Sequence, residues 1–312
     1  MKLSEVAVLY VAHKQSIGMR FRTEQRILKS FCRAMGDIAM ADVQANPVLA
    51  FISGTGPVTR FWHRKYEVLS GFYRLAISRG YCAVSPLPRL VPKRPPAFVP
   101  YIYSHDELRR LLEATSLCEH PCCKVRAHTF RALILLLYGA GLRISEALAL
   151  TLNDLDLSTA LIQIRETKFY KTRLVPIGPD LVRTLTHYAG QRKKDHSAQS
   201  ERPFFVCRMG NAIQPWTPDL IFGRVRRRAK VERHDGGRFQ PRLHDLRHSF
   251  AVHRLISWYR QGANVQRLLP QLATYLGHVD VAATQRYLTM TPELLREASQ
   301  RFERYAWEAT HE

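Results

Sequence analysis

Apolar residues recur at three- and four-residue spacing along much of the chain, which is the pattern of amphipathic helices. Near the N-terminus this spacing predicts helices over residues 22–35 and 61–80. Six prolines then fall within residues 83–100, where they neither continue a helix nor donate to a sheet ladder. We therefore expect a small helical domain over residues 1–97, a proline-rich connection, and a second domain over residues 98–312.

Beyond the prolines, helical spacing is interrupted once by strict alternation. Ser104 and Glu107 form a capping-box pattern at the start of a helix, and further helices are predicted over residues 128–141 and 142–150. Residues 161–178 alternate apolar and polar positions on either side of a polar turn, which predicts a β-hairpin. Strands this few cannot build a parallel sheet, so the expected fold class is α+β and mostly helical.

The charge balance points to a polyanionic partner. The chain carries 47 Lys and Arg against 26 Asp and Glu, a formal net charge of +21, and its isoelectric point is near 10.1. An excess this large costs self-repulsion in the free protein, which favours nucleic acid binding over a merely basic surface. Aromatic residues interleave with cations over residues 60–74, where we expect the rings to lie in the core. The candidates for contact with a DNA backbone are Arg60, Arg64, Lys65, Lys171, Arg224 and Arg227.

Cysteine usage and hydropathy bear on the compartment. The six cysteines do not form the regular framework of a secreted disulfide scaffold, which favours a reducing cytoplasm. The most apolar segment, residues 132–142, is too short to span a bilayer, and the N-terminus lacks a signal-peptide pattern. We expect a cytoplasmic protein without a membrane partner. The segment 118–123, "CEHPCC", lacks a second paired-cysteine motif, so no metal and no cofactor are expected.

The stretch "RLHDLRHSF" carries the most chemistry per residue. His244 and His248 have the i, i+4 spacing that grips zinc, but the zinc motif has a glutamate where Asp245 stands, and Arg247 would place a cation beside the ion. His244 and Arg247 also share a helical face and could hold an oxyanion, since guanidinium matches phosphate oxygens in a bidentate way. Arg143 begins a helix after a glycine-rich turn and is a second candidate for an anion.

A tyrosine could supply a nucleophile to such a phosphate site. Tyr287 follows His278 by nine residues in "LGHVDVAATQRYL". Because the pKa of tyrosine is about 10, nearby cations would have to favour the phenolate before it attacked phosphorus. Taken alone, a tyrosine here is more often a half-buried core aromatic than a nucleophile.

Four segments in order, "GAGLRISEALAL", "TKFYKTRLVPIG", "LHDLRHSFAVHRL" and "LGHVDVAATQRYL", resemble the tyrosine recombinases of the phage integrase and Xer type. They span residues 139 to 288, and the helical first domain resembles the core-binding domain of the family. The resemblance implies that Arg143 and Arg247 clamp the non-bridging oxygens of the scissile phosphate. It also implies that His244 and His278 assist by hydrogen bonding and proton transfer, that Tyr287 is the nucleophile, and that Lys168 protonates the leaving 5′-hydroxyl.

The same resemblance implies a site-specific recombinase that joins strands through a 3′-phosphotyrosine, acting on double-stranded DNA as a homo- or hetero-tetramer on paired sites, with accessory recombinases as further partners. Integration or transposition of a mobile element is the favoured role. Resolution of chromosome or plasmid dimers and relaxation of supercoils by the same chemistry are alternatives, and a non-catalytic DNA-binding protein is another. A metal-dependent nuclease would instead use Glu146, Asp154 or Asp245.

Two features of this chain depart from the family pattern. Residues 257–271 lengthen the interval between Arg247 and His278, and we expect them to form a loop or an extended helix. The hairpin turn reads "TKFYK" in place of a glycine-rich sequence, and two readings of Phe169 and Tyr170 stay open, contact with DNA or packing within the protein. Lys171 is a near neighbour that could be mistaken for Lys168.

Overall fold

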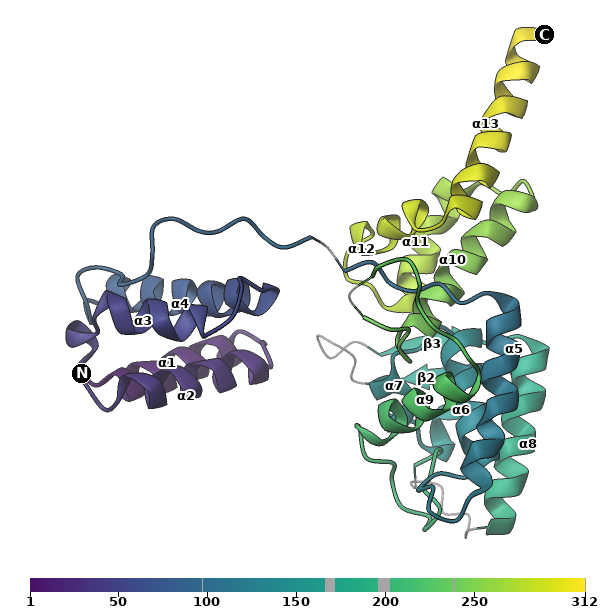
Figure 1. The fold of residues 1–312 in the computed structure, drawn as a ribbon, viewed down its shortest axis with the longest axis horizontal. Helices are drawn as coiled ribbons and strands as arrows, with labels where there is room; N and C mark the ends of the chain where they lie inside the picture. Colours follow the sequence, from purple (N-terminus) through teal and green to yellow (C-terminus); the bar gives the residue numbers. More distant parts are fainter. Residues whose placement is uncertain (97, 166–171, 196–202, 238, 312) are drawn as a thin grey trace. The chain divides into compact units, whose positions relative to one another are not determined.

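The computed structural model describes residues 1–96, 98–165, 172–195, 203–237 and 239–311 (Figure 1). The chain divides into two compact units, an N-terminal unit of Met1–Phe98 and a C-terminal unit of Val99–Glu312. The division falls within the proline-rich segment, where no helix or strand is formed between Ser78 and His105 among the described residues.

The N-terminal unit is a small helical bundle. It consists of α1 (Leu3–Ser16), α2 (Arg22–Met35), η1 (Met40–Asp42), α3 (Ala45–Ser53) and α4 (Arg60–Ser78). Figure 1 shows α1 beside α2 and α3 beside α4. The predicted helices correspond to α2 and α4, whereas α1 and α3 were not predicted. The apolar start of the chain is a core helix, because Leu3 and Val6 are fully buried.

Aromatic rings of α4 mostly face the core, as the sequence predicted. Trp62 and Tyr73 are buried, and Tyr66 stacks on Trp62 with ring centroids 5.5 Å apart. Phe61 is the exception, since 55% of it is exposed. The bundle is therefore held together by ring packing, with cations left at its surface.

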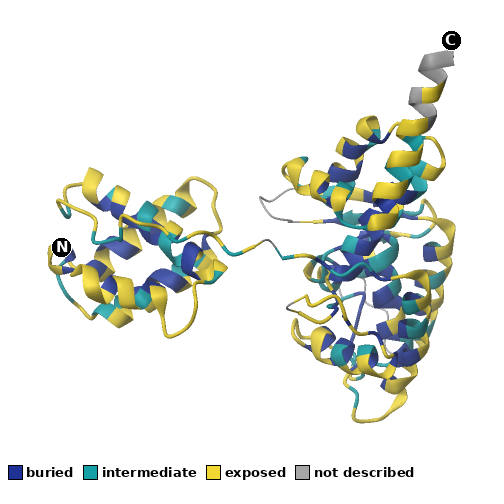
Figure 2. Ribbon diagram, turned by 45° about the horizontal axis from the view of Figure 1, so that its top comes forward, coloured by how far each residue is buried: buried dark blue, intermediate teal, exposed yellow. Residues whose placement is uncertain are grey.

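The C-terminal unit is mostly helical around one small sheet. Its helices are α5 (His105–Glu113), η2 (Ala114–Glu119), α6 (Ala127–Gly139), α7 (Ile144–Ala149), η3 (Leu152–Asp154), α8 (Pro179–Asp195), α9 (Thr217–Arg228), α10 (Asp245–Arg260), α11 (Val265–Leu276), α12 (Ala282–Gln285), η4 (Arg286–Thr289) and α13 (Pro292–His311). One core lies between α6, α8, α9 and the sheet, and a second gathers α10, α11 and the start of α13. Figure 2 shows the buried residues on the faces where these helices meet.

The sheet has three antiparallel strands in the order β1 (Leu155–Asp156), β2 (Leu161–Ile164) and β3 (Arg173–Pro176). The predicted hairpin is confirmed as β2 and β3, whereas the two-residue strand β1 was not predicted. The register pairs Ile162 with Val175 and Ile164 with Arg173, so both isoleucines are buried on one face. The hairpin turn, which carries Lys168 and Lys171, lies outside the described residues.

The helix starts follow from local capping. The predicted capping box at α5 is present, with the Glu107 backbone N–H donating to Ser104 Oγ and the Ser104 N–H donating to the Glu107 carboxylate. The lengthened interval after Arg247 forms the last turn of α10, a short turn, and the start of α11, which is capped by Asn264. Residues 257–271 are therefore neither one loop nor one extended helix, but two helical stretches joined by a turn over residues 261–264.

Two findings concern the environment of the chain. In the residues that the structure describes, no helix combines the length and the hydropathy needed to cross a membrane. All six cysteines are free thiols.

Candidate active site

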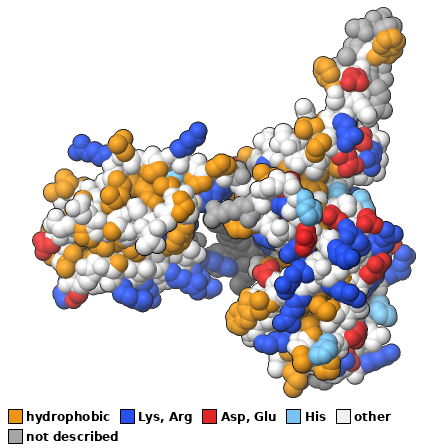
Figure 3. Space-filling model, in the orientation of Figure 1, with side chains coloured by type: hydrophobic (Ala, Val, Ile, Leu, Met, Phe, Trp, Pro, Cys, Tyr) orange, Lys and Arg blue, Asp and Glu red, His pale blue; other side chains and the backbone are white. Residues whose placement is uncertain are grey.

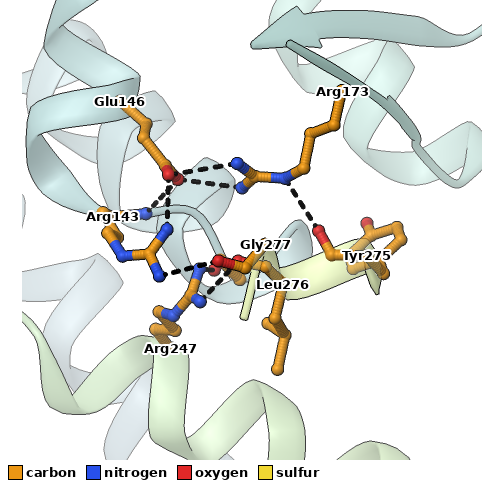
Figure 4. A network of polar contacts seen from close by, with 8 residues as sticks. Arg143, Glu146, Arg173, Arg247, Tyr275, Leu276 and Gly277 are labelled. Atoms are coloured by element: carbon orange, nitrogen blue, oxygen red, sulfur yellow. Dashed lines mark hydrogen bonds and ion pairs between the residues drawn. The ribbon is translucent and has the colours of Figure 1, made fainter. Parts of the chain in front are cut away.

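Arg143 lies where the chain turns from α6 into α7. Gly141 allows this turn because its φ of +59° lies in the left-handed region that favours glycine. The Arg143 guanidinium donates to Glu146 Oε1 at 2.6 Å and to the backbone carbonyl of Gly277 at 3.1 Å. Arg143 is thereby attached to its own helix and to the end of α11 (Figure 4).

Arg247 is the most enclosed cation of the site. Only 2% of it is exposed, and its two terminal nitrogens donate to the carbonyls of Gly141 and Leu276, both at 2.6 Å. Burial lowers the pKa of Arg247 to about 10, and the nearby Arg143 charge acts in the same direction. The side chain stays cationic at neutral pH, and two fixed carbonyls hold its orientation.

Arg173, which the sequence analysis did not select, joins these two arginines. It begins β3, donates from Nε to the Tyr275 carbonyl at 3.0 Å, and donates from both terminal nitrogens to Glu146 at 3.1 and 2.9 Å. Burial would raise the pKa of Glu146, but hydrogen bonds and charge from Arg173 and Arg143 outweigh it and lower that pKa to about 2. Alternation offered a signal, since Arg173 shares a strand face with buried Val175.

Tyr287 is buried beside these cations, with 2% of its surface exposed. Its hydroxyl lies 3.0 Å from His248 Nδ1, and its ring centroid lies 6.2 Å from that of His278. Burial raises the pKa of Tyr287, although the charges of Arg247, Arg286 and Arg143 oppose the rise. The cations act in the expected direction and lower the pKa of Tyr287, but burial outweighs them and the net shift is upward.

The three histidines around Tyr287 are held neutral. Burial is the main cause that lowers the pKa of His248 to about 3 and that of His278 to about 4. Desolvation and the Arg247 charge also lower the pKa of His244, whose ring meets that of His248 edge to face at 4.9 Å. A neutral imidazole can accept a hydrogen bond, but pKa values lowered this far make these rings weak bases as long as no anion is bound beside them.

The orientation of His278 is fixed by a residue that the sequence analysis did not select. His278 Nδ1 lies 2.7 Å from the hydroxyl of Thr284, which is fully buried in α12. His248 was considered only for metal binding, and the structure instead places it against Tyr287. Arg143, Arg247, His278 and Tyr287 thus come together as predicted, with His244 at the edge of the group.

The candidates for DNA contact differ in their exposure and in the bonds they make within the protein. Arg60 and Arg64 are exposed on α4, and Arg64 pairs with Glu24. Lys65 instead donates to the Phe51 carbonyl at 2.6 Å and lies over the Phe51 ring. In α9, Arg224 and Arg227 are exposed. Figure 3 shows Lys and Arg side chains distributed over the visible surface of both units.

The carboxylates considered for a metal-dependent nuclease do not converge. Glu146 pairs with Arg143 and Arg173, Asp154 with Arg165, and Asp245 with Arg242. Across the described part of the chain, no group of three or more His, Cys, Asp or Glu residues could hold a metal ion. Three arginines of the site, Arg143, Arg173 and Arg247, lie near one carboxylate, that of Glu146, so positive charge is left over and suits an anionic ligand.

Comparison with known proteins finds a family model and several sequences that match this chain. A model of the phage integrase family matches residues 102–293. The integrase/recombinase y4rB of Sinorhizobium fredii is 35% identical over 309 residues, which cover 96% of this chain and 96% of the relative. The tyrosine recombinase XerC of Xanthomonas campestris is 31% identical over 270 residues, which cover 86% of this chain and 76% of the relative.

Solved structures share the fold at low identity. The Tn1549 transposon integrase in complex with transposon right end DNA has a TM-score of 0.69 at 16% identity, covering 98% of this chain and 100% of that one. A lambda integrase dimer bound to a COC′ core site has a TM-score of 0.67 at 15% identity, covering 93% and 78%. The predicted class, α+β and mostly helical, is confirmed.

Proposed function

The chain belongs to the phage integrase family and is a tyrosine-type site-specific DNA recombinase, and we propose that Tyr287 is its nucleophile. The observation that carries this proposal is the packing of Tyr287 among Arg143, Arg247 and neutral histidines. A phosphate bound by the two guanidinium groups would lie beside the tyrosine hydroxyl. This arrangement suits attack on phosphorus better than hydrolysis by a metal-bound water.

The proposed step transfers the phosphoryl group from the 5′ oxygen of the DNA to the oxygen of Tyr287. The Tyr287 oxygen attacks the scissile phosphorus, the bond from phosphorus to the 5′ oxygen breaks, and a 3′-phosphotyrosine forms. His248 Nδ1, 3.0 Å from the hydroxyl, is the nearest group to take the tyrosine proton, and we propose that the negative charge of the bound phosphate raises the lowered pKa of His248 so that it can act as the base. Lys168, assigned by its place in the family motif, gives a proton to the departing 5′ oxygen. Attack by another 5′-hydroxyl reverses the step, so no ATP is required.

The arginines supply the electrostatic part of the mechanism. Negative charge gathers on the non-bridging oxygens as the phosphorus becomes five-coordinate, and preorganised cations stabilise it without reorganisation. Arg143 and Arg247 hold fixed positions on neighbouring carbonyls, and Glu146 is shared with Arg173 and cannot neutralise them all. We propose that the reaction uses no metal and no cofactor, since guanidinium groups take the place of a cation.

The biological setting is a further part of the proposal. The solved relatives include a lambda integrase tetramer bound to a Holliday junction and a transposon integrase bound to transposon DNA. We propose that this chain binds double-stranded DNA through both domains, 1–97 for DNA binding and 98–312 for catalysis. It would act in the cytoplasm as a tetramer on paired sites, alone or with a second recombinase, to move a mobile element.

Dimer resolution is the second candidate role, because the chain is 31% identical to a XerC recombinase. The mobile-element role is favoured by the integrase/recombinase y4rB, which is more similar and is matched over nearly its whole length. The two roles predict different DNA sites for the same chemistry.

A nicked suicide substrate tests the nucleophile. It carries the end sequence of the element that encodes the chain, and the reaction contains EDTA. A covalent protein–DNA band should form with the parent chain and disappear with Tyr287→Phe, which retains the ring and removes the hydroxyl. A band that survives in the Phe variant would exclude Tyr287, and a band that EDTA abolishes would contradict the metal-free mechanism.

A further inference from the structure

Three consecutive backbone carbonyls at the end of α11, those of residues 275–277, accept hydrogen bonds from three different arginines (Figure 4). Arg173 of β3 donates to the first at 3.0 Å, Arg247 of α10 to the second at 2.6 Å, and Arg143 to the third at 3.1 Å. The last carbonyls of a helix have no partner within the helix and carry partial negative charge. One short turn therefore fixes the relative positions of the three cations.

Arg173 differs from the other two arginines in how its nitrogens are used. Nε donates to a carbonyl, and each terminal nitrogen donates to one oxygen of Glu146. Its side chain is 11% exposed. The two terminal nitrogens of Arg173 face a carboxylate, which occupies the fork and compensates its charge, whereas those of Arg247 face two neutral carbonyls, which leave its charge uncompensated. From these contacts we infer that Arg173 is a positioning residue, which sets the geometry of Arg143 and Arg247 without binding the scissile phosphate itself.

The first route of this effect passes through Glu146. Without Arg173, both carboxylate oxygens of Glu146 would be available to Arg143, and a bidentate pair would neutralise the Arg143 charge and turn its fork away from a ligand. Arg173 engages both oxygens and leaves Arg143 a single side-chain bond to Oε1 at 2.6 Å. Two cations then share one carboxylate, and the surplus positive charge remains for an anion.

The second route passes through the turn after α11. Gly277 has a φ of +68°, and a Cβ built on it would lie 2.7 Å from Arg173 Nη1. The guanidinium of Arg173 is therefore packed flat against the turn that carries the acceptor of Arg143 and leads directly into His278. A shift of Arg173 would move the acceptor carbonyls and the backbone of His278 together.

The place of Arg173 in the sheet explains how β3 can hold this side chain in a fixed position. Its register partner is Ile164, which is buried in the main core of the unit. Arg173 also follows Lys168 by five residues in sequence. The same residue thus joins the base of the hairpin, through a paired strand, to the turn that holds both arginine clamps.

This inference rests on the proposed function, and its test compares two substrates. One carries the native scissile phosphate, and the other carries a methyl group in place of one non-bridging oxygen, which removes the negative charge that the clamps neutralise. The variant is Arg173→Lys, because lysine keeps the charge near Glu146 and loses the planar fork. Arg208→Lys is the matched control, since Arg208 also donates to backbone carbonyls, those of Cys118 and Cys123.

The single-turnover rate of covalent band formation is measured at saturating DNA. Arg173→Lys should slow cleavage of the native phosphate by roughly 10- to 100-fold, because misplaced donors lose most of their effect on the transition state. On the methyl-substituted phosphate the variant should fall within about threefold of the parent, since charge neutralisation no longer limits the rate. Arg208→Lys should change neither ratio.

Coupling gives a second readout. If Arg173 acts through Arg143, the double variant Arg173→Lys, Arg143→Lys should be little slower than Arg143→Lys alone. A parental rate in Arg173→Lys, an equal loss on both substrates, or losses that multiply in the double variant would each overturn the inference. Failure of the proposed function has a different signature, because then the parent forms no band or Tyr287→Phe retains it, and the inference falls with it.

Discussion

The two units use arginine in opposite ways. On α4 of the N-terminal unit, Arg60 and Arg64 lie at the surface above a core of packed rings. In the C-terminal unit, Arg247 is 2% exposed and is held by two carbonyls at 2.6 Å. A surface cation is solvated, and it contributes to DNA binding mainly through counterion release. A buried cation needs fixed acceptors, which also fix its direction.

This difference teaches where a change of one side chain should matter. Replacing a surface cation removes one charge among many, whereas replacing a buried one leaves acceptors unsatisfied and moves the groups beside it. Variants in the C-terminal site should therefore affect the chemical step, and variants on α4 should affect DNA affinity.

The largest effect is expected from Arg247→Lys. Lysine can reach one carbonyl and not both, and it cannot present two parallel donors to a phosphate. The single-turnover cleavage rate at saturating DNA should fall by roughly 100- to 1000-fold. Arg254→Lys in the same helix is the control, because Arg254 is exposed and lies over the Phe250 ring. A loss below about tenfold in Arg247→Lys would show that position matters less than charge.

Gly277→Ala should be the next most damaging change. The new Cβ would meet Arg173 at 2.7 Å, and a φ of +68° is strained for alanine. We expect a loss of about 1–3 kcal/mol in the free energy of unfolding and a roughly 10- to 100-fold slower cleavage.

The control for this glycine lies in the N-terminal unit. Gly36 has a φ of +82°, and a Cβ there would meet nothing within 4 Å. Gly36→Ala should destabilise by about 1 kcal/mol through backbone strain alone and leave the cleavage rate of folded protein unchanged. Equal effects of the two substitutions on cleavage would mean that the contact between Gly277 and Arg173 has no part in the mechanism.

Stability should depend on pH through the buried histidines. The pKa of His248 is lowered to about 3, and those of His278 and His253 to about 4, in each case mainly by burial. The unfolded chain binds protons at these residues below about pH 6.5, where the folded chain does not. The free energy of unfolding is therefore unaffected by these histidines above about pH 6.5, and it falls as the pH decreases from 6.5 toward 4, because protons bind the unfolded chain.

Urea denaturation at pH 7 and pH 5 measures this dependence. Each histidine would contribute up to about 2 kcal/mol between these pH values. Because the rings are partly exposed, screening by solvent reduces the sum, so the free energy of unfolding should be about 3–5 kcal/mol smaller at pH 5. In His278→Gln the difference should shrink, since one titrating group is gone, and a chain that is equally stable at both pH values would contradict the assignment. Glu146, with a pKa of about 2, should contribute nothing over this range.

The sequence was informative where each candidate residue lies inside a recognisable motif. Arg143, Arg247, His278 and Tyr287 each belong to a motif whose order along the chain restricts the fold, and the structure brings them together. The helix α1 could also have been found, because buried Leu3, Val6, Ala7 and Tyr10 follow helical spacing. A short apolar run at the start of a chain also fits the h-region of a signal peptide, so its periodicity alone does not separate the two.

The rest depended on contacts between distant segments. Alternation places Arg173 on an inward face, but its partner Glu146 lies 27 positions away in another element. The i, i+4 spacing of His244 and His248 suggests a metal, and only the fold brings Tyr287, 39 positions later, against His248. The direction of the Tyr287 pKa shift depends on burial, which a list of nearby charges does not contain.

The smallest effect is expected from Arg64→Ala, because Arg64 is 47% exposed and already pairs with Glu24 and Glu67. DNA affinity should fall by less than about tenfold, the slope of log affinity against log salt should decrease by about one, and cleavage at saturating DNA should not change. Glu24→Gln is the reciprocal variant, since it removes one of the two carboxylates that pair with Arg64 and should raise affinity slightly. If Arg64→Ala slowed the chemical step at saturating DNA, the separation between binding cations in one unit and catalytic cations in the other would fail.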